Sequence, residues 1–122
     1  MAEMVKAAVL VEPGKLEIQE FPRPSLEEGG LFVKTITGGI CESDVHFYKG
    51  ESVQYAGTPR ETYGPYPAIP GHENVGVIVE ARHPRGGKIR NFYGNELDEG
   101  DRIIISPDIV CGECYWCRHT YG

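Results

Sequence analysis

Three cysteines near the end of the printed sequence constrain the fold most strongly. Cys111, Cys114 and Cys117 are each separated by two residues. This spacing is typical of a loop that turns its thiolates toward one zinc ion. A closed site needs a fourth ligand, and His119 follows Cys117 too closely to supply it without strained geometry. The spacing therefore predicts a cysteine-rich zinc lobe that contains three ligands.

Other interpretations of these cysteines stay open. The same triplet begins the ferredoxin iron–sulfur run, but the next cysteine of that run would fall at Tyr121. Three free thiols are a further alternative. A secreted chain could pair its four cysteines in two disulfides, yet three are crowded together and Cys41 is remote, which favours metal binding.

A second candidate centre combines residues that are distant in the sequence. Cys41 and His72 offer a thiolate and an imidazole, which are ligands that zinc prefers. Taken alone, the cysteine could be a small core residue and the histidine a satisfied polar one. Both follow a glycine corner, however, and each has a carboxylate nearby, Asp44 and Glu73. Metal-binding histidines commonly need such a carboxylate behind the second ring nitrogen, so we predict a folded metal site.

The segment after Cys41 also carries groups that can move a proton. Ser43 supplies a hydroxyl and His46 an imidazole within one short stretch. Together they could carry a proton from a zinc-bound alcohol to solvent.

Short alternating segments predict a mainly β fold. The expected strands cover 4–12, 16–21, 31–37, 74–80 and 102–105. Pro13-Gly14 supplies a hairpin turn, and Gly76 lets a neighbouring backbone come close. A short helical segment should follow Gly38-Gly39, with Ser43 or Asp44 as its cap.

Two segments lack a regular pattern. Residues 51–67 predict a loop over the surface or the mouth of a pocket. Residues 82–98 are rich in basic side chains and glycines, and could form either a phosphate-binding patch or a solvated hairpin extension. The extension is favoured because no regular element presents those charges on one face.

Composition limits the class of protein. The 122 residues suffice for one domain, and a formal net charge of −6 argues against nucleic acid or an anionic membrane as the main partner. No apolar run reaches membrane-spanning length, and the first residues lack the apolar core of a signal peptide. We therefore expect a cytoplasmic protein.

Several motifs occur together in a characteristic order. They are Gly39-Ile40-Cys41-x-Ser43-Asp44-x-His46, Pro70-Gly71-His72-Glu73-x-x-Gly76, Gly100-Asp101-Arg102 and the late cysteines. In this order they resemble the catalytic domain of the zinc-dependent medium-chain alcohol and polyol dehydrogenases. The resemblance covers nearly the whole chain. It implies that residues 1–122 form a GroES-like, partly open β-barrel with short helices and a cysteine-rich zinc lobe.

The resemblance also implies a role for each candidate residue. Cys41 and His72 would bind a catalytic zinc, with Glu73 as a nearby ligand and Asp44 as the partner of His72. Ser43 would accept the proton of the substrate hydroxyl and His46 would relay it. Three of the four ligands of a structural zinc would be Cys111, Cys114 and Cys117. The implied substrate is a small alcohol or carbonyl compound, the hydride carrier is NAD or NADP, and the intact protein is expected to be a homo-oligomer.

The sequence departs from the family pattern in ways that matter. The fourth structural cysteine would fall just beyond Gly122, the third catalytic ligand would lie further on, and no Gly-x-Gly-x-x-Gly of a Rossmann cofactor domain is present. We therefore expect the front part of a longer enzyme, truncated within the cysteine lobe and inactive when isolated. Glu42 stands where some relatives carry a basic residue for the cofactor pyrophosphate, and an acid there would repel it.

Proteins of other kinds remain as alternatives. A non-catalytic zinc-binding β-domain, acting as a structural or interaction module, would have no use for a reactive Cys41 beside Ser43 and His46. A zinc-free quinone reductase of the same superfamily would not need Cys41, His72 and the cysteine lobe together.

Overall fold

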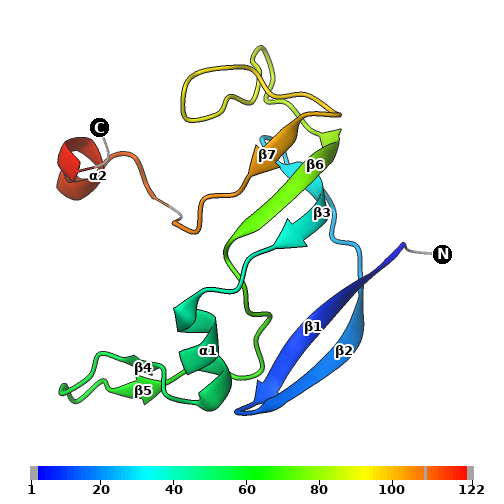
Figure 1. Cartoon of the computed structure of the whole chain (residues 1–122). Helices are drawn as coiled ribbons and strands as arrows, with labels where there is room; N and C mark the ends of the chain where they lie inside the picture. Colours follow the sequence, from blue (N-terminus) through cyan, green and yellow to red (C-terminus); the bar gives the residue numbers. More distant parts are fainter. Residues whose placement is uncertain (1–2, 109, 121–122) are drawn as a thin grey trace.

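The computed structural model describes residues 3–108 and 110–120, and these form mainly strands with two short helices (Figure 1). In chain order the elements are β1 (Met4–Glu12), β2 (Lys15–Pro22), β3 (Leu31–Gly38), α1 (Glu42–Lys49), β4 (Val53–Gln54), β5 (Thr62–Tyr63), β6 (Asn74–Ala81), β7 (Arg102–Ile104) and α2 (Tyr115–Thr120). The mainly β prediction and all five expected strands are confirmed, with boundaries within one residue.

The first two strands form an antiparallel hairpin whose tip is tied to α1. Gly14 has a φ of 77°, a conformation that glycine adopts without steric cost, so the predicted turn is confirmed. The backbone N–H of Gly14 donates to the Tyr48 carbonyl at 2.7 Å, and the Tyr48 hydroxyl donates back to the Gly14 carbonyl at 2.8 Å. These two bonds fix the hairpin against the helix that carries candidate site residues.

The larger sheet has the order β3-β6-β7, and all its pairings are antiparallel. Gly76 in β6 pairs with Thr35, and a Cβ added there would collide with the Val33 side chain and the Lys34 carbonyl. The expectation that this glycine admits a neighbouring backbone is confirmed. The missing side chain lets the backbones of β3 and β6 approach closely at this pair.

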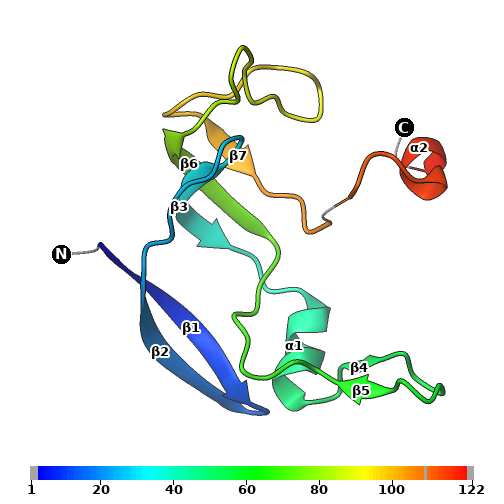
Figure 2. The same cartoon turned by 180° about the vertical axis from the view of Figure 1, so that it is seen from behind.

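The β1–β2 hairpin forms a sheet of its own, separate from the larger sheet. An isolated bridge connects β1 to the segment before β6. Leu10 and Ala68 exchange two backbone hydrogen bonds, at 2.8 and 3.1 Å. Leu10 is fully buried and Val9 nearly so, although they lie on opposite faces of the strand. The end of β1 lies beside the segment before β6 (Figure 2), and there β1 has buried residues on both faces.

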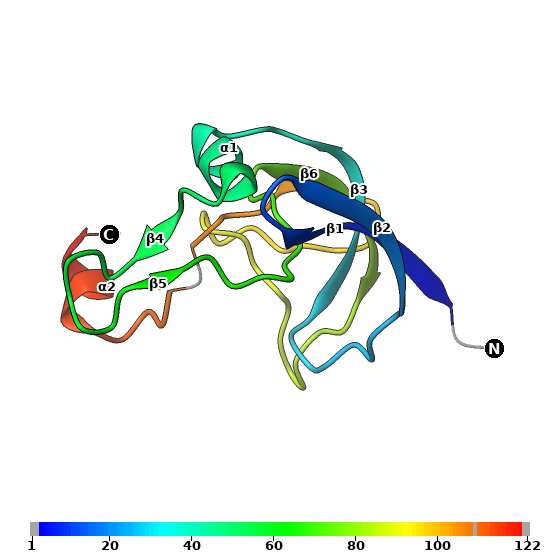
Figure 3. The same ribbon diagram turned by 90° about the horizontal axis from the view of Figure 1, so that it is seen from below.

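Residues 51–67 are more ordered than the loop expected from sequence. They contain the short antiparallel pair β4–β5, which projects on the opposite side of α1 from the β1–β2 hairpin (Figure 3). The rings of Phe47 in α1 and Tyr66 stack with centroids 4.9 Å apart, and the Tyr66 hydroxyl donates to the Phe47 carbonyl at 2.6 Å. This contact anchors the end of the segment to the helix.

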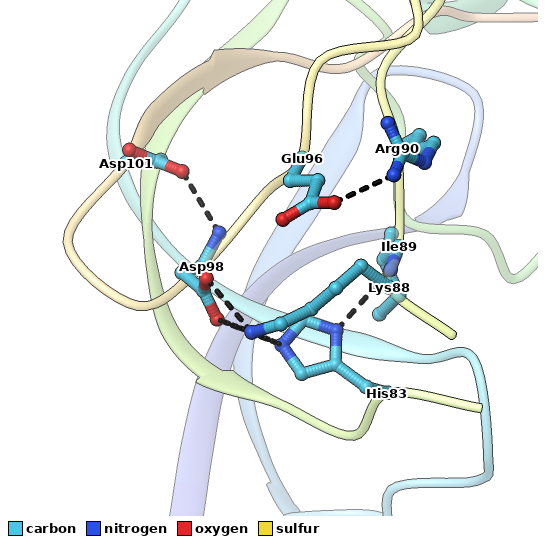
Figure 4. Close-up of polar contacts among 7 residues, drawn as sticks. All are labelled: His83, Lys88, Ile89, Arg90, Glu96, Asp98 and Asp101. Atoms are coloured by element: carbon cyan, nitrogen blue, oxygen red, sulfur yellow. Dashed lines mark hydrogen bonds and ion pairs between the residues drawn. The ribbon is translucent and has the colours of Figure 1, made fainter. Parts of the chain in front are cut away.

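The segment between β6 and β7 is a solvated extension held together by its own charges (Figure 4). Lys88 Nζ lies 2.9 Å from both carboxylate oxygens of Asp98, and His83 Nε2 lies 2.7 Å from Oδ1 of the same group. Arg90 pairs with Glu96 at 2.5 Å, next to an antiparallel bridge between these two residues. Since these basic groups are paired internally, the arrangement favours the hairpin extension over a phosphate-binding patch.

The buried apolar core is small. In the described part of the chain, the buried hydrophobic residues are Val9, Leu10 and Ile78. The accessible surface is 9584 Å², against about 6500 Å² for a compact monomer of 13.5 kDa. Large side chains such as Ile40 (83% exposed) and Ile104 (79%) account for part of the difference. Among the described residues, no helix is both long and apolar enough to cross a membrane.

Candidate metal centres

The register of the larger sheet brings the two parts of the first centre together. Gly38, the last residue of β3, pairs with Asn74, the first residue of β6. One residue further, the Gly39 N–H donates to the Glu73 carbonyl at 2.8 Å. The chain segments that carry Cys41 and His72 therefore leave and enter the same end of the sheet, side by side.

Three potential ligands meet at this point. One sulfur, one imidazole nitrogen and one carboxylate oxygen of Cys41, His72 and Glu73 all lie within 4.8 Å of one another. Cys41 and His72 are half-buried and Glu73 is exposed. A thiolate, an imidazole and a carboxylate form a donor set that zinc accepts, so the residues present fit this ion.

Asp44 lies against the histidine of this cluster. Its Oδ1 is 3.5 Å from His72 Nδ1, and its Oδ2 accepts the backbone N–H of Cys41 at 2.9 Å. The contact at Nδ1 leaves Nε2 as the ring nitrogen available to a metal. Asp44 is the third residue of α1, and through the second contact it accepts the N–H of the residue before the helix, as in a capping box.

The helix cap differs from the prediction. The N-cap of α1 is Cys41, with extended backbone (φ −84°, ψ 157°), and not Ser43 or Asp44, which lie inside the first turn. The expectation was wrong in position because Asp44 reaches back to the cap N–H instead of serving as the cap itself. Cys41, a potential metal ligand, is therefore also the residue that fixes the corner between β3 and α1.

Local hydrogen bonds favour the metal-binding form of the cysteine. The Ser43 hydroxyl, the Ser43 backbone and His72 all hydrogen-bond to the Cys41 sulfur and lower the pKa of its thiol. The same Cys41 contact raises the pKa of His72, against partial desolvation, and Asp44 adds to the increase. In the absence of a metal, the pair is thus biased toward thiolate and imidazolium.

A glycine makes room for the carboxylate of Glu73. A Cβ at Gly39 would collide with Oε2 and Cβ of that side chain. The Glu73 carboxylate therefore rests directly on the Gly39 backbone, beside Cys41. From the sequence, this glycine marked only the start of the helical segment and part of a motif, because its role as a cradle for Glu73 depends on the pairing of β3 with β6.

The two proposed proton carriers have different surroundings. Ser43 is in contact with Cys41, as described above. The described contacts of His46 go instead to two carboxylates, Glu51 at 2.8 Å from Nδ1 and Glu42 at 3.8 Å from Nε2. The contact with Glu51 was not predicted from the sequence, although Gly50 after the helix signals that the chain reverses there.

The late cysteines form a second cluster at the start of α2. The sulfur of Cys117 lies 3.7 Å from that of Cys111 and 3.4 Å from that of Cys114. Thiolates around a tetrahedral zinc are separated by about 3.8 Å, whereas disulfide sulfurs are about 2 Å apart. The three side chains thus converge on a common point with a spacing that fits zinc.

The cysteine lobe is more helical than the extended loop expected from the spacing. Cys117 lies within α2, a helix that the sequence analysis did not predict. His119 Nδ1 contacts the Tyr115 carbonyl at 2.7 Å, and the two rings stack at 4.2 Å. His119 is therefore engaged along the helix and is outside the cysteine cluster, while Tyr121 lies outside the described residues.

Backbone donors surround the first sulfur of this lobe. The N–H groups of Glu113 and Cys114 point at Cys111 and, with the neighbouring thiols, lower its pKa to about 7. Such donors stabilise a thiolate, the form that binds metal.

An apolar cavity adjoins the first centre without reaching its ligand atoms. It has a volume of about 380 Å³ and its lining includes Gly39, Ile40, Asp44 and Gly71. These residues precede or orient the potential ligands, and none of the three ligand residues lines it. The cavity therefore lies beside the groups that position the ligands.

Comparison with known proteins identifies the family. The profile of the family described as "Alcohol dehydrogenase GroES-like domain" matches residues 27–121. The chain belongs to this family. It is 40% identical over 116 residues to an alcohol dehydrogenase from Geobacillus stearothermophilus, a match that covers 93% of this chain and 29% of that protein.

Solved structures of dehydrogenases share the fold of this chain. The crystal structure of an alcohol dehydrogenase from Thermotoga maritima superposes with a TM-score of 0.76 at 34% identity, covering 98% of this GroES-like chain and 29% of the other. A putative zinc-binding dehydrogenase from Sinorhizobium meliloti, bound to NADP, has a TM-score of 0.65 at 30% identity, covering 95% and 28%. The GroES-like fold is thus confirmed, and the chain spans less than a third of the length of these relatives.

Proposed function

We propose that residues 1–122 are the GroES-like catalytic domain of a zinc-dependent oxidoreductase that interconverts an alcohol or polyol and its carbonyl compound. The observation that carries the proposal is the convergence of Cys41, His72 and Glu73 from two chain segments, with Asp44 behind His72. The relatives reported above are dehydrogenases, and one of them is bound to NADP. NAD or NADP would accept the hydride in the whole protein.

Each residue of the first centre has a defined task in this proposal. Cys41, His72 and Glu73 would hold the ion, which when bound supplies Lewis acidity that lowers the pKa of an alcohol. Asp44 would orient His72 and fix Nδ1 as its protonated nitrogen. Ser43, already in contact with the Cys41 sulfur, would take up the proton that the alcohol releases.

The cysteine lobe would have a structural role. Cys111, Cys114 and Cys117 converge at a spacing that suits zinc, but no proton-transfer group of the first centre lies among them. We propose that they hold a structural zinc and fix the conformation of residues 111–120. The cytoplasmic location and homo-oligomeric state of the whole protein stay predictions.

Elemental analysis tests the proposal directly. Zinc and iron should be measured on the purified 122-residue chain, on Cys41→Ala and on Cys114→Ala. We expect zinc without iron, a loss with Cys114→Ala that reports the lobe, and a separate loss with Cys41→Ala that reports the first centre. Iron with acid-labile sulfide would overturn the proposal in favour of an electron carrier.

Activity provides the second arm of the test. A dehydrogenase polypeptide that joins this domain to a nicotinamide-binding domain should lose alcohol oxidation when Cys41 is replaced by alanine. Unchanged activity and unchanged zinc in Cys41→Ala would instead support a non-catalytic zinc-binding module. The 122-residue chain alone should show no turnover with NAD and a panel of alcohols.

A further inference from the structure

The end of α1 folds back onto His46. Gly50 adopts the left-handed conformation (φ 77°) that ends the helix, and the next residue reverses direction. The backbone N–H of Glu51 donates to the His46 carbonyl at 2.9 Å. The same residue places its carboxylate 2.8 Å from Nδ1 of the His46 ring. Main chain and side chain of Glu51 thus both engage His46.

This contact decides which ring nitrogen carries the proton. An ionised carboxylate can only accept hydrogen bonds, so Nδ1 must be the donor in the contact with Glu51. In the neutral imidazole the other nitrogen, Nε2, is then a proton acceptor. Glu51 therefore selects one of the two tautomers of His46.

The accepting nitrogen, Nε2, faces the first turn of α1, which is the end of the helix next to Cys41. Nε2 lies 3.8 Å from Oε1 of Glu42, the first residue of α1, whereas Nδ1 meets Glu51 beyond the last residue. Ser43 is three residues before His46, on the same helix face. The ring consequently lies between two carboxylates, with Nε2 toward Glu42, the residue before Ser43, and its Nδ1–H toward Glu51.

We propose that Glu51 is a positioning residue for His46, holding the imidazole in the tautomer that accepts a proton at Nε2 from the Ser43 side. The proposal rests on the dehydrogenase function proposed above. The proton released by the alcohol and passed on from the Ser43 hydroxyl bonds to the Nε2 lone pair and forms an imidazolium. Glu51 stabilises this cation through Nδ1–H, and the Nε2 proton then leaves to water. His46 is 52% exposed in its side chain, so solvent can reach it.

Histidine tautomers in the zinc-loaded 122-residue chain test the contact itself. Nitrogen NMR at pH 8 should show His46 mainly protonated at Nδ1. Glu51→Ala should shift it to a mixture with Nε2–H, while Glu51→Asp should keep the original tautomer. The matched control is Glu42→Ala, which removes the carboxylate nearest the other nitrogen and should leave Nδ1–H in place. The signals of His72 and His83 report whether each variant is folded.

Two NMR results would overturn the proposal. One is a wild-type His46 protonated at Nε2. The other is an equal change of tautomer in Glu51→Ala and Glu42→Ala, because the effect would then be one of general charge and not of the contact at Nδ1.

Kinetics in a dehydrogenase polypeptide containing this domain separate positioning from function. Glu51→Ala should lower kcat about 10-fold with KM unchanged, and Glu51→Asp should restore most of it. If His46→Gln lowers kcat but Glu51→Ala does not, the positioning role is overturned and the dehydrogenase function stands. If alcohol oxidation occurs and His46→Gln leaves it unchanged, the relay and the role of Glu51 both fail.

Discussion

The carboxylate of Asp44 lies 3.5 Å from Nδ1 of His72 and also accepts the backbone N–H of Cys41, the N-cap of α1. One side chain thus links two segments that are separated in the sequence by the rest of α1 and residues 50–71. It is 16% exposed, so its contacts are partly protected from solvent. The folding of α1 and the orientation of a potential metal ligand therefore depend on the same group.

Replacing Asp44 by asparagine should weaken zinc binding at the first centre. Asparagine can still accept the Cys41 N–H and keep the cap, but it loses the charge that favours a proton at His72 Nδ1. We expect about 10- to 100-fold lower zinc affinity. Competition with a chromophoric chelator measures this in a background where the three late cysteines are serine, so that one site is titrated.

The control for this experiment is Glu42→Gln, which replaces an exposed carboxylate on the same helix. It removes the same charge without touching His72, and its zinc affinity should stay near that of the parent. An unchanged affinity in Asp44→Asn would mean that the 3.5 Å contact does not support metal binding.

Cys111 should be unusually reactive in the metal-free chain. Its pKa of about 7 is set by backbone N–H groups, so half of it is thiolate near neutral pH, whereas an ordinary cysteine needs a pH of about 8.5. The rate of Cys111 alkylation by iodoacetamide, followed by peptide mass spectrometry, should reach half its maximum near pH 7. In urea the midpoint should move up to the ordinary value, and bound zinc should suppress the reaction. A midpoint that is the same in folded and unfolded chain would contradict the role of the backbone donors.

Gly76→Ala should destabilise the larger sheet. The added Cβ would collide with the Val33 side chain and with the Lys34 carbonyl, and a backbone atom in a paired strand has little freedom to move away. We expect a loss of about 1–3 kcal/mol in the free energy of unfolding, measured by urea denaturation. The control is Gly87→Ala, whose Cβ would meet only Pro84 at 3.6 Å, an ordinary contact. Equal midpoints for the two variants would show that the sheet can accommodate the methyl group.

Much of the fold was predictable because its signals are local. Pro13-Gly14 and the alternation around it are sufficient for the β1–β2 hairpin, and Gly76 indicates close strand contact. The short pair β4–β5 was missed because it has two residues per strand and no periodicity. It is fixed by tertiary contacts such as the stack of Phe47 on Tyr66.

The candidate site was predictable in its residues but not in all its contacts. Cys41, His72 and Glu73 were selected by type and by motif, and the register of β3 on β6 brings them together. The proximity of Glu51 to His46 was not foreseen, because it depends on the reversal at Gly50. The helical conformation around Cys117 was likewise missed, since six residues of helix leave a weak pattern in sequence.

The charge cluster around Asp98 should make the free energy of unfolding depend on pH in the acid range. Hydrogen bonds from Lys88 and His83 lower the pKa of Asp98 below its ordinary value of about 3.9. A carboxyl whose pKa is lowered by folding stabilises the folded state above its unfolded pKa, and this contribution is lost as the pH falls through the lowered folded pKa. Asp98→Asn should therefore have a lower urea midpoint than wild type at pH 6, and the two midpoints should converge as the pH drops below the ordinary value. Glu99→Gln, the neighbouring exposed carboxylate, controls for net charge and should follow wild type at both pH values. If Asp98→Asn and Glu99→Gln behave alike, the extension between β6 and β7 is held by its backbone turns and not by these ion pairs.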